Sequence, residues 1–157
     1  AGPPLCAAVV RAVRSLSPST KRVVLEAEDS RFRFTAGQWI DLHIPGLSTI
    51  GGFTITSTPA QLPLFELAVK ASEHPPSRWV TQQCSEGDAV QVRVGGSFCL
   101  PSPRPASTIF IAGGVGITPL YAMLQQLLAE EAPAALPAPR AVLLYSAVSM
   151  EELLFAS

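Results

Sequence analysis

Long hydrophobic runs are absent from this sequence of 157 residues, although hydrophobic residues make up 48% of it. Charge or proline interrupts the apolar stretches every few positions, so none reaches the roughly 20 residues that a membrane-spanning helix needs. An excess of charge of one sign is also lacking, because the formal net charge is −1 and the lysines and arginines are dispersed. We therefore expect no membrane span and no binding of nucleic acid.

Cysteine and histidine are scarce, with three and two copies respectively. Cys6, Cys84 and Cys99 are far apart and form no C-x-x-C pair. They predict neither a disulfide framework nor a zinc or iron–sulfur site, and buried free thiols are the expected state. His43 and His74 are isolated, so an ordinary surface or hydrogen-bonded role is the simpler interpretation for each. The sequence therefore predicts no metal site.

A glycine-rich corner between a strand pattern and a helix pattern is the most informative stretch. Residues 108–112, TIFIA, are typical of a parallel strand buried on both faces. We expect a helix from Pro119 to about Ala129, with Thr118 as its N-cap. Its apolar stripe would consist of Leu120, Met123, Leu124, Leu127 and Leu128. The residues between strand and helix include Gly113, Gly114 and Gly116.

Glycines at such a corner can adopt positive φ and leave no Cβ in the way of a ligand. A ligand's phosphate could then approach backbone N–H groups at the helix N-terminus. The alternative is a turn that merely connects a strand to a helix, but the strand and helix context favours a binding site. Because Pro119 takes the place of the third glycine in G-x-G-x-x-G, a different dinucleotide fold is indicated.

The chain before the corner has the pattern of six short strands. They are expected at residues 7–16, 21–28, 39–44, 51–57, 64–70 and 89–94. A helix from Arg78 to about Cys84, with Ser77 as its N-cap, would lie between the fifth and sixth strands. Short antiparallel strands without crossover helices suggest a closed or nearly closed barrel.

The chain after the corner is expected to complete a parallel βαβ unit. A Pro/Ala-rich surface loop over residues 130–140 would lead to a second buried strand at residues 141–146. Ser149 and Glu152 would then form a capping box. Two parallel strands with one full helix leave sheet faces uncovered, so we expect a unit that is cut short.

A domain boundary is expected where prolines 101, 103 and 105 form a stiff connection. We place it between residues 100 and 106, which gives domains 1–103 and 104–157. The sequence begins at Ala1 rather than methionine, so we also expect the native N-terminus to be missing.

Several motifs in order resemble the ferredoxin–NADP reductase superfamily, whose members are flavin and nicotinamide oxidoreductases. AGQWIDLHIPG (residues 36–46) resembles the G-Q-[YWF] strand, and GGFTITS (51–57) resembles the flavin-binding R-x-Y-[ST]-x-x-S. PPSRWV (75–80) is similar to the segment whose hydroxyl and helix start face the pyrophosphate. GDAVQVRVGGSF (87–98) resembles G-D-x-V-x-V-x-G-P-x-G-x-F, and LLYSAVSMEELLF (143–155) resembles the second strand of the nucleotide domain.

The resemblance implies a six-stranded antiparallel flavin-binding barrel followed by a truncated parallel nucleotide-binding βαβ unit. It implies an oxidoreductase that passes hydride from NAD(P)H to FAD and electrons to an unidentified acceptor, in a mitochondrial flavoprotein. Because later parts of the family's catalytic site would lie beyond Ser157, we expect this chain to be a fragment that is inactive alone.

The catalytic residue implied by the resemblance is Thr54, whose hydroxyl the family places near the flavin N5. The implied cofactor-binding residues are Phe53, Thr54, Ser57, Ser77, Arg78, Gly113, Gly114, Val115, Gly116, Ile117, Thr118 and Pro119. Taken singly, Thr54 and Ser57 also suit ordinary strand hydroxyls, and Ser77 a simple N-cap. Their order within one motif favours the site.

Three positions depart from the family pattern. Gly51 replaces the motif arginine and Phe53 the tyrosine, which removes a bidentate phosphate partner and a phenolic hydroxyl. Arg78 could compensate in part, and an arginine introduced at position 51 is expected to strengthen FAD binding. Val148 stands where many relatives carry an arginine for the 2′-phosphate of NADPH, which favours NADH. The alternative function is a non-enzymatic nucleotide-sensing or interaction module that lost firm flavin binding.

Overall fold

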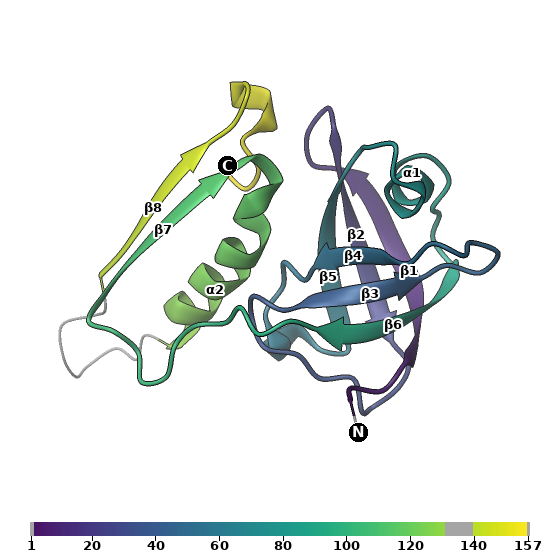
Figure 1. Ribbon diagram of the computed structural model, residues 1–157, viewed down its shortest axis with the longest axis horizontal. Coiled ribbons are helices and arrows are strands. Elements are labelled where there is room, and N and C mark those ends of the chain that lie inside the picture. The colour runs from purple at the N-terminus through teal and green to yellow at the C-terminus, as the bar shows by residue number, and fades with distance from the viewer. Residues whose placement is uncertain (1, 131–139, 157) are drawn as a thin grey trace.

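The computed structural model describes residues 2–130 and 140–156 (Figure 1). The first half of the chain contains β1 (Cys6–Ser15), β2 (Thr20–Ala27), β3 (Trp39–His43), β4 (Gly51–Thr54), β5 (Leu64–Lys70), α1 (Pro75–Gln82) and β6 (Ala89–Gly95). The second half contains β7 (Ser107–Gly113), α2 (Ile117–Glu130) and β8 (Arg140–Ser146). Short 3-10 turns are η1 (Pro59–Gln61), η2 (Gly114–Gly116) and η3 (Met150–Glu152). The predicted Pro/Ala-rich loop, apart from its ends, lies outside the described residues.

The first six strands form one antiparallel sheet in the order β4-β3-β6-β1-β2-β5. The two ends of this sheet meet just after β4, where Ile55 forms an isolated antiparallel bridge to Leu67 of β5. The N–H of Thr56 also donates to the carbonyl of Glu66 at 2.8 Å. This pairing closes the sheet upon itself, which confirms the predicted six-stranded barrel and the helix inserted before its last strand.

Alternating side chains fill the barrel interior, as their period of two predicts. In β6, Val90, Val92 and Val94 are buried while the residues between them are exposed. Ile40 and Leu42 of β3 point inward in the same way. One contiguous apolar core, formed by residues between Cys6 and Val94, therefore stabilises the barrel.

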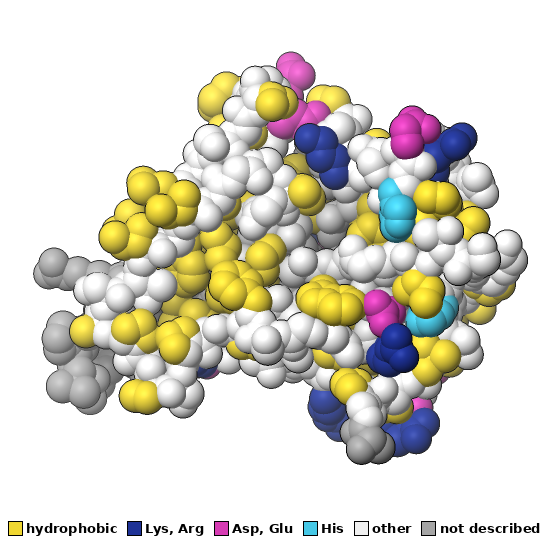
Figure 2. Space-filling model, viewed as in Figure 1, with side chains coloured by type: hydrophobic (Ala, Val, Ile, Leu, Met, Phe, Trp, Pro, Cys, Tyr) yellow, Lys and Arg dark blue, Asp and Glu magenta, His cyan; other side chains and the backbone are white. Residues whose placement is uncertain are grey.

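Helix α2 lies between the barrel and the two-stranded parallel sheet β7–β8 (Figure 1). One face of that sheet packs on the helix, where the buried residues are Phe110, Ala112, Ile117, Leu120, Met123 and Leu127. On the opposite face, Ile109 is 67% exposed and Ile111 is 74% exposed, and hydrophobic side chains gather over these strands (Figure 2). The prediction of strands buried on both faces is therefore wrong, because the described residues cover only one face.

Both predicted helix starts are corrected by the structure. Helix α1 begins at Pro75 with His74 at the N-cap, so that Ser77 lies inside the first turn, and it ends at Gln82 rather than Cys84. The fixed φ of proline suits these first helical positions. Helix α2 begins at Ile117, and the Thr118 hydroxyl donates to the carbonyl of Val115 at 2.9 Å instead of capping the helix.

Two further expectations about the second half differ from the structure. Leu128 is 68% exposed and does not join the buried stripe of α2, whereas Leu124 is partly buried. Ser149 stands at the N-cap of η3 without a side-chain capping bond, so the predicted capping box is absent there. The Glu152 carboxylate instead accepts hydrogen bonds from the barrel.

The barrel and the second half contact each other at several points besides the connecting chain. The Gln125 side chain of α2 donates to the carbonyl of Thr56 at 2.8 Å. Leu16, from the turn between β1 and β2, packs against the apolar cluster of α2 and β7. Within residues 2–130 and 140–156, no helix is both long and apolar enough to cross a membrane.

Candidate functional site

A cleft of about 540 Å³, here called the main cleft, lies between the barrel and the glycine corner. Strand β4, the end of β5 and helix α1 line it from the barrel side, and the start of α2 lines it from the other. Its lining residues are Gly52, Phe53, Thr54, Ala68, Val69, Lys70, Ala71, Ser72, Ser77, Val115, Gly116, Thr118 and Pro119. The fold thus brings residues predicted from the flavin motif together with residues predicted from the glycine corner.

A smaller cleft of about 270 Å³, here called the corner cleft, adjoins the main cleft. The two share Lys70 and Val115. The remaining lining residues of the corner cleft are Thr20, Gly113, Gly114, Ser146, Ala147, Val148, Glu152 and Leu154. The predicted corner residues are therefore divided between two neighbouring hollows.

The glycine corner presents accessible backbone to these clefts. Gly114 has a positive φ of +51°, a conformation that suits glycine, and a Cβ built at Gly114 or Gly116 would meet nothing within 4 Å. A ligand can therefore approach the main chain where strand β7 becomes helix α2. Ile117, by contrast, is fully buried in the core between α2 and β7, so its side chain lies away from both clefts.

The two hydroxyl residues of the flavin motif have different surroundings. Thr54 is half-buried in the lining of the main cleft, opposite Trp39 in the pairing of β3 with β4. Ser57 is buried, and its hydroxyl oxygen accepts the N–H of Glu66 at 3.0 Å. The structure therefore leaves the Thr54 hydroxyl available to a ligand and uses the Ser57 hydroxyl to join two segments of the barrel.

No space is available for the motif arginine at position 51. A Cβ built on Gly51 would lie 2.5 Å from the Phe53 ring and 2.7 Å from the Cβ of Pro76. Contacts this short require Phe53 or the start of α1 to move. This geometry opposes the expectation that Gly51→Arg strengthens FAD binding, which stays a prediction to be tested.

The start of α1 offers a phosphate few backbone donors. Pro75 and Pro76 have no N–H, and the N–H of Arg78 donates to the carbonyl of His74 at 3.0 Å. Ser77 is buried in the lining of the main cleft and can supply its N–H and its hydroxyl. An anion at this segment could therefore bind the N–H and hydroxyl of Ser77 and the positive end of the helix dipole.

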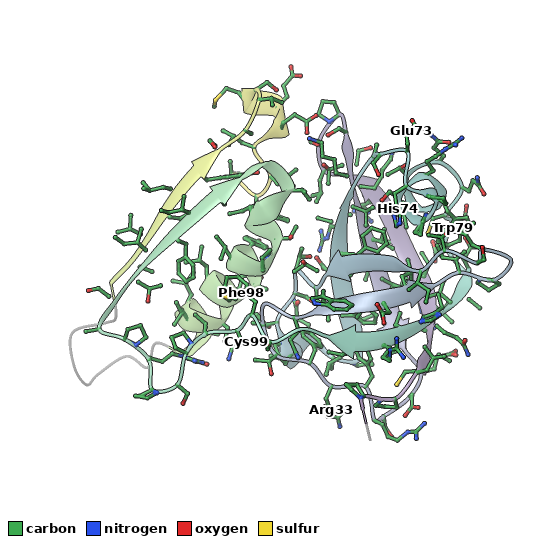
Figure 3. The ribbon with its side chains drawn as sticks, viewed as in Figure 1. Arg33, Glu73, His74, Trp79, Phe98 and Cys99 are labelled. Atoms are coloured by element: carbon green, nitrogen blue, oxygen red, sulfur yellow. The ribbon has the colours of Figure 1, made fainter. Side chains whose placement is uncertain are left out.

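Arg78 lies outside the linings of both clefts. Its guanidinium group is exposed and lies 3.9 Å from the carboxylate of Glu73, which precedes α1 at the upper end of the barrel (Figure 3). The structure thus gives no support to Arg78 as a substitute for the missing motif arginine.

Sequence reasoning missed Lys70, which lines both clefts. A lysine that ends an apolar strand is usually an ordinary solvated charge, so the pattern gave no signal. Sequence reasoning predicted Glu152 as part of a capping box and missed the contact of its carboxylate, whose pKa is lowered, with the barrel. The main cause is hydrogen bonding from Ser19 and then Ser17, and the charge of Lys70 contributes least.

The residues present fit a flavin next to a nicotinamide dinucleotide. The main cleft combines an aromatic ring, Phe53, with a hydroxyl, Thr54, and with open backbone at Gly52, where a Cβ would also meet nothing within 4 Å. Lys70 adds a positive charge at the junction with the corner cleft. Anionic, partly aromatic ligands suit such a lining.

Comparison with known proteins supports the nicotinamide-nucleotide part of this site. Residues 110–157 match the family described as the oxidoreductase NAD-binding domain. The chain is 47% identical to oxidoreductase NAD-binding domain-containing protein 1 of Bos taurus, over 95% of this chain and 52% of that protein. It is 35% identical to ferredoxin–NADP reductase B of Sorangium cellulosum, over 78% of this chain and 52% of that protein. The chain thus spans about half the length of these curated relatives.

A solved structure gives the same fold. The cytochrome P450 reductase from Amycolatopsis superposes with a TM-score of 0.82 at 25% identity, over 98% of this chain and 47% of that one. The arrangement of the barrel and the following strands and helix is therefore also that of a known reductase. The chain belongs to the ferredoxin–NADP reductase superfamily.

Proposed function

We propose that this chain provides the flavin-binding barrel and the glycine corner of an oxidoreductase that passes hydride from NAD(P)H to FAD. The single observation that carries this proposal is the composition of the main cleft. Thr54 and Phe53 of the barrel share this cleft with Val115, Gly116 and Pro119 of the corner. Two cofactors bound at these two walls would meet inside one hollow.

The cofactors would supply the redox chemistry, with hydride leaving the nicotinamide ring and entering the flavin ring. The residues of the chain would bind and align them. Thr54 would offer its hydroxyl at the flavin's reacting edge, and Phe53 would lie against the ring system. The accessible backbone of Gly114 and Gly116 would hold the dinucleotide, while Ser77 and Lys70 would hold phosphate oxygens.

NADH is the expected donor, since the segment after β8 gives the corner cleft no arginine. Val148 lines this cleft and is 89% exposed, and Glu152 lines it as an anion. An arginine would pair with the 2′-phosphate that distinguishes NADPH, whereas valine cannot. Lys70 remains as the cation of this lining, and we assign it to the phosphates shared by both dinucleotides.

Electrons would then leave the flavin for an acceptor whose identity the chain does not specify. The family resemblance suggests a mitochondrial location. The names of the matched proteins describe oxidoreductases, which favours a reductase over the non-enzymatic sensing module. Residues 1–103 and 104–157 would be the two functional parts.

The proposal is tested by removing the Thr54 hydroxyl in the full-length protein. Thr54→Ala should slow anaerobic reduction of bound flavin by NADH about tenfold, the effect of one lost hydrogen bond. Thr58→Ala is the matched control, since Thr58 lies outside both cleft linings. Failure of the wild-type protein to bind flavin, even after reconstitution with excess FAD, would reject the proposed function.

A further inference from the structure

Glu152, at the end of η3, is bonded to the turn between β1 and β2. Its carboxylate oxygen Oε2 accepts the hydroxyls of Ser17 at 2.8 Å and Ser19 at 2.7 Å. The other oxygen, Oε1, accepts the backbone N–H of Ser19 at 3.1 Å. One side chain from the far end of the sequence therefore holds both polar residues of a barrel turn, an arrangement we call the Glu152 clasp.

Apolar packing on both sides fixes the position of the clasp. Leu16, next to Ser17, packs against the cluster formed by α2 and β7. Leu154 is buried in that same cluster, and its N–H donates to the Tyr145 hydroxyl at 3.1 Å. The segment after β8 is thus held to its own strand and to the barrel at once.

The clasp stands at one wall of the corner cleft. The barrel contributes Thr20 and Lys70 to this cleft, while the glycine corner and the end of β8 face them. Thr20 directly follows the clasped Ser19. Because Glu152 belongs to the lining and also bonds the barrel, it limits how far the two walls can separate.

Charge strengthens this connection. The hydrogen bonds from Ser19 and Ser17 lower the pKa of the Glu152 carboxyl, so the group is ionised at neutral pH. Hydrogen bonds to an ionised acceptor are stronger than those between neutral groups. A second polar contact between the barrel and the second half runs from the Gln125 side chain of α2 to the Thr56 carbonyl. It involves neutral groups and lies just after strand β4, which lines the main cleft.

We propose that Glu152 is a positioning residue that fixes the glycine corner against the barrel and thereby sets the alignment of nicotinamide and flavin. The role in aligning nicotinamide and flavin rests on the proposed function, whereas the hydrogen bonds of the Glu152 clasp do not. A shift of about 1 Å between reacting groups can cost a hydride transfer about a hundredfold, so a small opening of this contact has a large effect.

The clasp is tested directly by amide hydrogen exchange in the absence of any cofactor. Glu152→Ala removes the acceptor of the Ser19 N–H, so exchange at Ser19 should become about tenfold faster. Amides of Val23 and Leu25 inside the barrel should not change. Glu151→Ala is the matched control, because Glu151 is exposed in the same turn. Unchanged exchange at Ser19 in Glu152→Ala would overturn the proposal.

The alignment is tested by rapid anaerobic reduction of the flavin in the full-length protein. Glu152→Ala should lower the limiting rate of reduction by NADH about tenfold or more, while the Kd for NADH changes less than about twofold. Combining Ser17→Ala and Ser19→Ala should reproduce this loss, and adding Glu152→Ala should then cost little more. A wild-type limiting rate in Glu152→Ala, or a weaker Kd with no change in that rate, would overturn the positioning role. If NADH does not reduce the flavin of the wild-type protein, the proposed function fails. The hydrogen exchange of the Ser19 amide still shows whether the Glu152 clasp exists.

Discussion

The Phe53 ring lies over Gly51, two residues earlier on the same face of β4, so that a Cβ at Gly51 would approach ring carbon Cε2 to 2.5 Å. The two departures from the family's flavin motif are therefore linked in space. Glycine at position 51 leaves room for this position of the ring. The missing arginine and the missing tyrosine therefore fall at two positions that are in contact with each other.

The first prediction concerns this pair. Gly51→Arg should lower the free energy of unfolding by about 1–3 kcal/mol, the usual cost of forcing extra atoms into a packed site. It should not tighten flavin binding. Adding Phe53→Ala should recover part of the lost stability, because the two residues are in contact and their effects are not additive. Denaturant unfolding of the single and double variants measures this coupling. Additive losses would contradict the contact.

The second prediction concerns Lys70. Lys70→Ala should weaken binding of the flavin or of NADH by about 10- to 150-fold, corresponding to one lost charge-assisted contact of about 1.5–3 kcal/mol. Equilibrium titration at two salt concentrations measures the effect, which should shrink at high salt. Lys21→Ala is the control, since Lys21 donates to Ser15 on the barrel turn and lies outside both clefts. Equal effects of the two variants would argue against a role for Lys70.

The barrel shows where sequence reasoning succeeds. The alternation of Val90, Val92 and Val94, and of Ile40 and Leu42, has the period of a strand with one buried face, and it is a purely local signal. The six strands and their antiparallel barrel could therefore be predicted without coordinates, whereas the family was indicated by the ordered motifs.

Local signals failed at the helix starts and at the sheet of the second half. Ser77 suits an N-cap by residue type, but the helix begins at Pro75, three residues before the predicted start at Arg78. Ile109 and Ile111 suit a doubly covered strand, yet nothing in the described part of the chain covers their face. Residue propensity indicates which local conformations a residue can adopt, whereas tertiary packing decides which neighbours it contacts.

The candidate site was predictable only in part for the same reason. Thr54 and the glycine corner belong to recognisable motifs and lie together in the main cleft, although their roles stay predictions. Lys70 belongs to no motif that we recognised, and the sequence pattern places Glu152 in a capping box rather than at the site. Glu152 is 133 residues from its partner Ser19, a separation over which the sequence gives no pairing signal.

The third prediction concerns thiol reactivity. Burial, followed by the charge of Asp88, raises the pKa of the Cys84 thiol to about 12. At about pH 8, only about one Cys84 in 10⁴ is then a thiolate, the reactive form. Burial also raises the pKa of the Cys99 thiol, but not to the value of Cys84. Iodoacetamide should label Cys99, which lies in the segment between β6 and β7 (Figure 3), well before Cys84. Cys99→Ser should abolish the early label. Its persistence in that variant would contradict the prediction.

The fourth prediction compares the stability of the two halves of the chain. Amides of β7 and β8 should exchange faster than those of β3 and β6, because the former belong to a two-stranded sheet with one exposed apolar face. The barrel strands lie in a closed sheet around their own core. Hydrogen exchange of the 157-residue chain resolves the two regions. Equal protection in a monomer would show that the second half is more stable than its exposed face suggests.

The most direct measurement of the central claim is anaerobic addition of NADH to the flavin-loaded, full-length protein. If the main cleft and the corner cleft hold the two cofactors side by side, the visible absorbance of the flavin should bleach rapidly. NADPH should bleach it more slowly, and Thr54→Ala should slow the reaction with NADH. Bound flavin that keeps its absorbance in the presence of saturating NADH and NADPH would contradict the account.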